Sequence, residues 1–145
     1  MVIEIIISEI DFYITQNIRE KRILSGMSQQ DLSCTIGESE SYFRNVEDPK
    51  HPQKMDHRML AKAARALKIE RYEDIYPEKV PKHDLVKIRL KLLKKENDEK
   101  EIDENGNVIP NMEIIFTKYL SEKEINEFKI REGRDKFLKI ISNGS

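Results

Sequence analysis

The sequence predicts a mainly α-helical protein with a small α+β tail: five short helices, then a β-hairpin and one further helix. Two observations support this prediction. Apolar residues recur at helical spacing in the first half, beginning with Ile10, Ile14 and Ile18. In residues 85–93 they alternate with basic residues, which is the two-residue period of a half-buried strand.

Two prolines near the middle of the chain separate these patterns. Pro77 and Pro81 prevent a continuous helix and favour an extended linker. We therefore expect a first domain at 1–77, a linker at 78–83 and a second unit at 84–145. The second unit is small and needs a supporting surface, from the first domain or from another chain.

The first two helices are marked by caps and glycines. Ser8 is a candidate N-cap for the first helix, which Gly26 ends, and residues before Ser8 either extend this helix or form a strand. Ser28 is expected to cap the second helix, with Asp31 at the fourth position of a capping box. Gly37 closes that helix.

Three more helices complete the first half. Ser39 is expected to cap the third, with Phe43 and Val46 facing inward. Asp56 opens the fourth, whose apolar face consists of Leu60, Ala63, Ala64 and Leu67. A short fifth helix over 71–77 is expected to lay three side chains over the others, namely Tyr72, Ile75 and Tyr76.

The second half carries the β signals. Asn105-Gly106 is typical of a hairpin turn, inside a charged stretch, 94–107, that we expect to form a loop. The alternation of Met112, Ile114 and Phe116 predicts a second strand on one apolar face. A helix capped by Ser121 and Glu124 follows, with Ile125 and Phe128 on its inner face, and Gly133 is expected to break it before apolar residues 136–141.

Composition excludes several classes of function. A net charge of −1 does not favour a general polyanion binder, so any DNA binding must come from a local arrangement of basic groups. Cys34 is the single cysteine, which fits a reducing cytoplasm, and the histidines are not spaced as metal ligands. No apolar run reaches membrane-spanning length and the chain start lacks the features of a secretory signal. We expect no enzyme, metal or cofactor, because no glycine-rich phosphate loop, nucleophile elbow or zinc spacing is present.

The stretch "KRILSGMSQQDLSCTIGESESYFRNVEDPK" resembles the helix-turn-helix of the phage lambda and Cro repressor-like (XRE) family. The shared pattern is Gly-apolar-Ser-Gln, a leucine at the fourth helical position, a glycine at the turn, a serine before the next helix and an apolar-Glu pair at its end. The resemblance covers about residues 10–77. It implies a five-helix lambda-repressor-like bundle that binds double-stranded DNA.

By this resemblance the third helix enters the major groove and reads bases. The expected DNA contacts of this region are Ser39, Glu40, Ser41, Tyr42, Arg44 and Asn45. Arg44 suits guanine, Asn45 adenine and Glu40 the amino group of cytosine. Tyr42 is expected on sugar or backbone. Alternatively, Glu40 pairs with Arg44 four residues later.

The resemblance also assigns positioning roles. Ser28 and Gln29 are expected to contact phosphate at a helix N-terminus, although Ser28 alternatively serves only as a cap. Lys50 and Lys54 are the expected loop contacts to phosphate, unless that loop is simply solvated. A pair between Arg22 and Glu47 is expected to join the first helix to the end of the third.

These features predict a sequence-specific transcriptional regulator of the repressor type, bound as a homodimer to a two-fold operator. The second unit is the candidate dimer interface, or it packs on the bundle. Alternatively, it binds a second protein, as in an antitoxin, or the whole chain is a scaffold without DNA binding.

Overall fold

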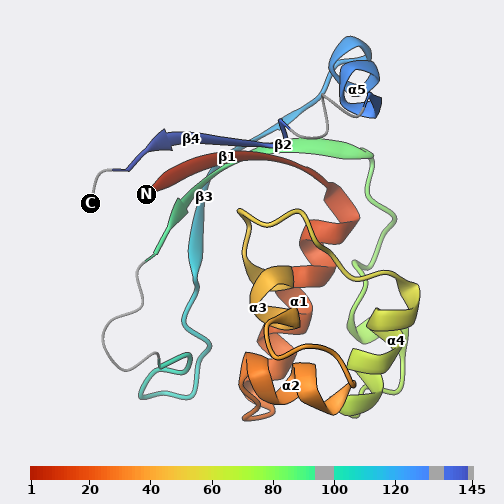
Figure 1. The fold of residues 1–145 in the computed structure, drawn as a ribbon, viewed down its shortest axis with the longest axis vertical. Helices are drawn as coiled ribbons and strands as arrows, with labels where there is room; N and C mark the ends of the chain where they lie inside the picture. The colour runs from red at the N-terminus through yellow and green to blue at the C-terminus, as the bar shows by residue number, and fades with distance from the viewer. Residues whose placement is uncertain (94–99, 131–135, 144–145) are drawn as a thin grey trace. The chain divides into compact units, whose positions relative to one another are not determined.

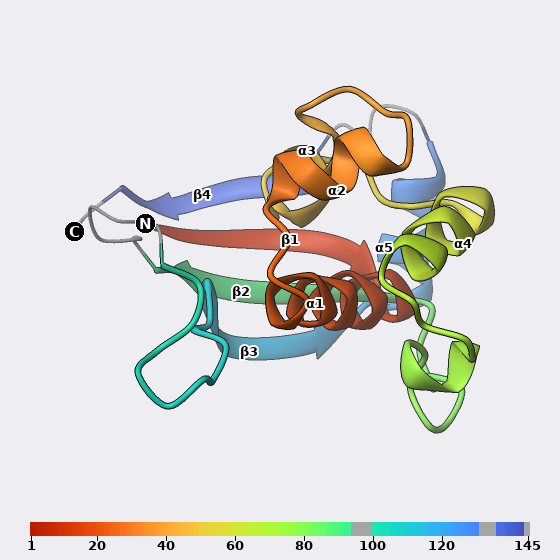
Figure 2. The same ribbon diagram turned by 90° about the horizontal axis from the view of Figure 1, so that it is seen from below.

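The computed structural model describes residues 1–93, 100–130 and 136–143, and it contains a four-stranded antiparallel sheet (Figure 1). The strands lie side by side in the order β3-β2-β1-β4 (Figure 2). Their bounds are Val2–Ser8 (β1), Leu85–Leu92 (β2), Met112–Tyr119 (β3) and Leu138–Ser142 (β4). The predicted mainly α fold with a small α+β tail is therefore wrong, because the sheet is substantial and draws on both ends of the chain.

The chain divides into two compact units. A sheet unit consists of Met1–Glu9, Lys82–Glu101 and Ile109–Ser145, and a helical unit consists of Ile10–Pro81 and Ile102–Val108. The first residues thus lie in the same unit as the C-terminal half, whereas the expected first domain at 1–77 included them. The helical unit is an insertion within the sequence of the sheet unit.

The first residues form a central strand, which resolves the alternative left open for them. β1 is rich in β-branched isoleucine and pairs with β2 on one side and β4 on the other. Ile3 lies opposite Leu90, and Ile5 lies opposite Ile88. These four side chains are buried on one face of the sheet. β1 ends at Ser8, and α1 begins at the next residue.

A bulge in β3 changes which side chains share a face. Leu90 pairs with Ile114, but Arg89 pairs with Phe116, so Ile115 is an extra residue without a β2 partner. Met112 and Ile114 therefore lie on one face and Phe116 on the other. The predicted simple alternation of these three residues is wrong for Phe116.

The face that carries Phe116 is polar. The Arg89 guanidinium donates to Glu4 at 2.9 Å and lies 4.7 Å from the centre of the Phe116 ring. On the same face Lys87 donates to Glu124 of α5 (Glu122–Lys129) at 3.1 Å. Glu124 and Ser121 form the predicted capping box at the start of α5.

The connection between β2 and β3 holds the predicted Asn105-Gly106 turn. Gly106 adopts a φ of +81°, which favours glycine, and the Asp103 carboxylate accepts from the Asn107 amide at 2.9 Å. A single bridge joins Ile102 to Val108 beside this turn. The rest of the charged loop, 94–99, and the predicted break at Gly133 lie outside the described residues. The last apolar stretch contains β4.

The helical unit is built from short helices. They are α1 (Glu9–Leu24), α2 (Gln29–Thr35), α3 (Tyr42–Glu47), α4 (His57–Ala66) and the 3₁₀ helix η1 (Tyr72–Asp74). Asp56 caps α4 as predicted, because its carboxylate accepts from the Met59 amide at 2.8 Å. η1 is shorter than the predicted fifth helix, and Tyr72 is 56% exposed and does not cover the core.

One apolar core holds these helices together. Its buried members come from every helix of the unit and from η1's C-terminal flank: Ile14, Ile18, Leu32, Ile36, Tyr42, Phe43, Val46, Leu60, Ala63, Ala64, Leu67 and Ile75. The Asn17 side chain of α1 donates to the carbonyls of Asp74 and Ile75 at 3.0 and 2.7 Å. This contact fastens the end of η1 to the first helix.

The sheet makes a direct prediction for β1. Ile5→Ala removes a side chain that is 2% exposed, so we expect it to lower the free energy of unfolding by about 2–5 kcal/mol. Ile6→Ala, on the other face and half-buried, is the matched control and should cost less. Urea unfolding followed by circular dichroism measures both. Equal effects would contradict the assignment of faces.

Candidate nucleic-acid interface

The start of α2 is closed by its own side chains. The Ser28 hydroxyl accepts from the Asp31 amide at 2.9 Å, and the Asp31 carboxylate accepts from the Ser28 amide at 3.2 Å. This is the predicted capping box. Because both Ser28 groups are used and a carboxylate stands at this helix end, the geometry favours the cap over a phosphate contact by Ser28.

A buried serine joins α2 to α3. The Ser33 hydroxyl donates to the Gln29 carbonyl at 2.7 Å and accepts from the Phe43 amide at 3.0 Å. Ser33 is fully buried, so this hydroxyl satisfies a backbone donor in the first turn of α3 that has no partner within its own helix. It fixes the angle between the two helices.

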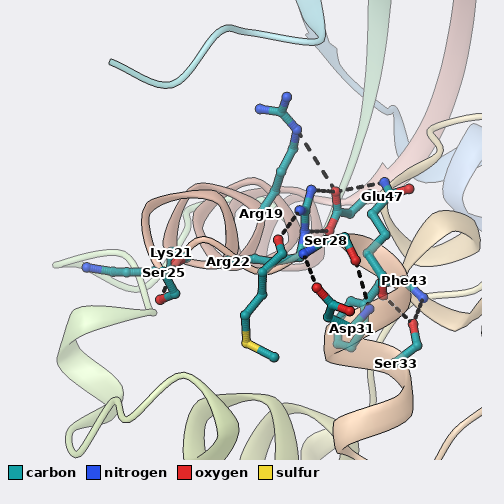
Figure 3. Close-up of polar contacts among 11 residues, drawn as sticks. Arg19, Lys21, Arg22, Ser25, Ser28, Asp31, Ser33, Phe43 and Glu47 are labelled. Atoms are coloured by element: carbon teal, nitrogen blue, oxygen red, sulfur yellow. Dashed lines mark hydrogen bonds and ion pairs between the residues drawn. The ribbon is translucent and has the colours of Figure 1, made fainter. Parts of the chain in front are cut away.

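The ion pair predicted from the resemblance is present and buried. The Arg22 guanidinium donates to both Glu47 oxygens at 2.8 Å and to the Met27 carbonyl at 2.8 Å (Figure 3). The Gln29 amide donates to Glu47 at 3.1 Å, and Arg19 lies 4.0 Å from the same carboxylate. Glu47 thus ties the end of α3 to α1 and to the start of α2.

Two lysines close the C-terminal ends of α2 and α3. The Lys62 ammonium donates to the Ile36 carbonyl at 3.1 Å. The Lys54 ammonium donates to the carbonyls of Val46 and His51 at 2.9 and 3.1 Å. Cations at helix C-termini stabilise the exposed carbonyls there. Lys54 therefore has a structural role at the end of α3, in addition to the phosphate contact expected from the sequence.

The two sides of α3 differ as predicted. Phe43 and Val46 are fully buried. Arg44 is exposed and Asn45 is half-buried on the other side. Arg44 has five donors in a planar fork and Asn45 has a donor and an acceptor, which are groups that pair with base edges.

Tyr42 is not on that outer side. It is 5% exposed and meets Phe43 edge to face, with ring centres 5.1 Å apart. Burial, with the nearby carboxylates of Asp56 and Glu38, raises the pKa of the Tyr42 hydroxyl to about 12. Tyr42 thus lies in the core and not on the outer side, where the expected contact with sugar or backbone would be made, because it precedes the buried Val46 by four residues.

The turn before α3 also differs from expectation. α3 begins at Tyr42, so Ser41, not Ser39, precedes it, and neither Ser41 nor Ser39 provides the predicted side-chain cap. Ser39 and Glu40 are exposed in this turn, and Ser41 is half-buried. Glu40 lies outside the helix, so the helical spacing proposed for a pair with Arg44 does not apply.

The remaining expected contacts lie on either side of α3. Lys50 is exposed in the loop after α3, where its amide donates to the Asp48 carboxylate at 2.9 Å. Gln29 is half-buried, with its amide on Glu47. The exposed or half-exposed polar groups of the turn and α3 therefore lie between Ser39 and Lys50 in the sequence. Gln29 is linked to this segment by its hydrogen bond to Glu47.

Sequence reasoning missed the contacts of Ser33, Lys62 and Arg19. Ser33 follows Leu32 within a short helix. A serine at this position does not indicate by itself that its hydroxyl bonds to the Gln29 carbonyl and the Phe43 amide. Lys62 acts across 26 residues. The contacts of Lys62 and Arg19 join segments distant in sequence, and the contact of Ser33 with Phe43 joins two helices, so local patterns do not reveal them.

Comparison with known proteins finds no matching family model, no similar curated protein and no similar solved structure. Within the described part of the chain no helix is long and apolar enough to span a membrane. The same residues contain no cluster of three or more histidine, cysteine, aspartate or glutamate side chains able to hold a metal ion.

The buried ion pair predicts an asymmetric response to mutation. Arg22→Met or Glu47→Leu alone leaves one buried charge without its partner, so each should lower the free energy of unfolding by about 3–5 kcal/mol. The double variant removes both charges and should recover much of this loss. Urea unfolding of the three variants measures the coupling. Additive single effects would show that the two side chains do not act as a pair.

Lys54 predicts a pH dependence of stability. Burial lowers the pKa of its ammonium from 10.5 to about 8, although Asp48 and Asp11 act in the opposite direction. Between these values the unfolded chain binds the proton and the folded chain does not, so stability should rise with pH from about 8 towards 10.5. Lys54→Met should lack this rise.

The comparison is made by urea unfolding at pH 7.5–9.5. Above pH 10 the raised pKa of Tyr42 acts in the opposite sense, because the unfolded chain loses the phenol proton first. Lys62→Met is the matched control, since it also removes a lysine from a helix C-terminus. The same pH slope in the wild type and in Lys54→Met would contradict the assignment.

Proposed function

We propose that the protein is a sequence-specific DNA-binding transcriptional regulator, which inserts α3 into the major groove of a two-fold operator. The observation that supports it best is the geometry of α3. Its inner side is anchored in the core by Phe43 and Val46, its end is held by Glu47, and Arg44 and Asn45 lie on the outer side. The sequence resemblance to XRE helix-turn-helix proteins is a second, independent support.

Local charge determines whether such a surface attracts DNA. The chain as a whole has a net charge of −1 and supplies no attraction. Arg22 neutralises Glu47, and Arg44 and Lys50 are exposed. Glu40 is exposed as well, so it opposes the approach of phosphate unless it accepts from the amino group of a cytosine. We therefore expect specific binding to exceed nonspecific binding clearly.

A dimer is part of the proposal. One small helical unit makes few base and phosphate contacts, and a second copy doubles them and sets the spacing of half-sites at one helical turn. A regulator of this kind acts in the compartment that holds the DNA, which is the cytoplasm for a bacterial or phage protein.

A gel shift against the DNA upstream of the protein's own gene tests the function. We expect a shift at low salt that weakens steeply as salt rises, because phosphate contacts release counterions. A shift that requires the product of a neighbouring gene would favour the antitoxin alternative instead. No shift at low salt would overturn the regulator proposal.

Two substitutions test the assigned roles on the shifted site. Arg44→Ala should weaken specific binding by about 1–3 kcal/mol and relax the preference at one base pair. Lys50→Ala should weaken all sequences alike and reduce the salt slope. Arg71→Ala, whose side chain is 76% exposed and pairs with Glu73, is the control. Fluorescence anisotropy with specific and random duplexes measures all three, and equal small effects of the first two would contradict their roles.

A further inference from the structure

The sheet has two edges that are not paired within the described chain. The strand order β3-β2-β1-β4 places β3 and β4 at the outside, where each pairs with one strand only (Figure 2). An edge strand presents a row of backbone donors and acceptors that a second strand can join. Natural proteins protect such edges with charges, with short strands or with a cover.

β3 is the longer of these edges and carries more of the exposed large apolar side chains. It has eight residues against five in β4. Ile114 and Ile115 are 51% and 50% exposed, and Tyr119 is 60% exposed. Tyr119 stacks on His83 with ring centres 3.5 Å apart, which holds the end of the strand in place. An edge of this length with exposed isoleucines needs a cover.

The sequence of β3 is complementary to itself. When two copies of Met112–Tyr119 run antiparallel with their centres aligned, Glu113 of each copy lies opposite Lys118 of the other. Ile114 then lies opposite Thr117, and Met112 lies opposite Tyr119. An antiparallel strand pair of this kind has two-fold symmetry, so both Glu–Lys pairs form in one dimer.

The bulge makes this register consistent. In a regular strand residues 113 and 118 would lie on opposite faces, since their positions differ by five, an odd number. Here Glu113 lies opposite Lys91 and Lys118 lies opposite Lys87 on the same, polar face of the sheet, because Ile115 is an extra residue. Both members of each Glu–Lys pair therefore point to one side, as directly opposed residues must.

We propose that two copies of this chain pair along β3 in this register, forming one continuous sheet across the dimer. The two-fold axis passes beside Ile115 and Phe116, at the centre of the strand. The exposed isoleucines become covered by the second copy, and opposite charges flank them on both sides. This pairing concerns the sheet unit alone, so it is measured without DNA and does not depend on the proposed function.

Charge reversal tests the register. Glu113→Lys places two lysines opposite each other at both ends of the interface, and Lys118→Glu places two glutamates there. Like charges directly opposite are destabilising, so each variant should raise the dimer dissociation constant about tenfold in sedimentation equilibrium. A mixture of the two variants should form a heterodimer as tight as the wild-type dimer, and so should the double variant with itself. Circular dichroism checks that each variant is folded.

Lys139→Glu on β4 is the matched control, since Lys139 is an exposed lysine at the opposite edge. It should leave the dimer intact. Dissociation by Lys139→Glu, with no effect of the β3 variants, would place the interface on β4 and overturn the proposal. A wild-type protein that sediments as a monomer at every concentration would overturn it as well.

A disulfide cross-link gives an independent test that does not rely on charge. Cys34 is first replaced by serine, because it is exposed. Glu113→Cys and Lys118→Cys proteins, mixed and oxidised, should form a heterodimeric disulfide in high yield. Each variant alone should not, because five residues of strand separate it from its own counterpart across the axis. Equal cross-linking of each variant alone, or none in the mixture, would reject the register.

Discussion

The geometry of the helical unit depends on the buried pair between Arg22 and Glu47. Both side chains are almost without solvent contact, and the bonds around them join different segments: α1, Met27 in the turn before α2, the first residue of α2 and the end of α3. Desolvation offsets most of the attraction in such a pair. The pair therefore contributes mainly to the orientation of α3. It fixes the rotation of this helix about its own axis and thereby determines which residues face outward.

The short helices make this orientation necessary. α2 has seven residues and α3 has six, and helices of that length are not stable alone in water. Their free backbone groups are satisfied from outside, by Ser33 at the start of α3 and by Lys54 and Lys62 at the C-terminal ends. Apolar burial supplies the driving force, and these polar contacts select one arrangement of the two helices.

Local patterns predicted a good part of the structure. The capping boxes at Ser28 and Ser121, the inward pair of α3 and the buried alternation of β2 all depend on residues within a few positions of one another. The pairing of β1 with β2 and β4 joins residues at least 77 apart, and an apolar run such as Val2–Ile7, interrupted only by Glu4, is compatible with helix or strand. The sheet and its strand order were therefore beyond the reach of pattern alone.

The same distinction explains the errors at the candidate site. Ser39 and Ser41 are both acceptable N-caps by residue type, and neither choice shows where Tyr42 points. Tyr42 lies four residues before Val46, so helical spacing puts it on the inward side with that residue. In β3 the cause is different, because the bulge at Ile115 adds one residue and turns Phe116 to the polar face. The two surfaces on which the proposals depend, the outer side of α3 and the outer edge of β3, follow from this helical spacing and from this bulge.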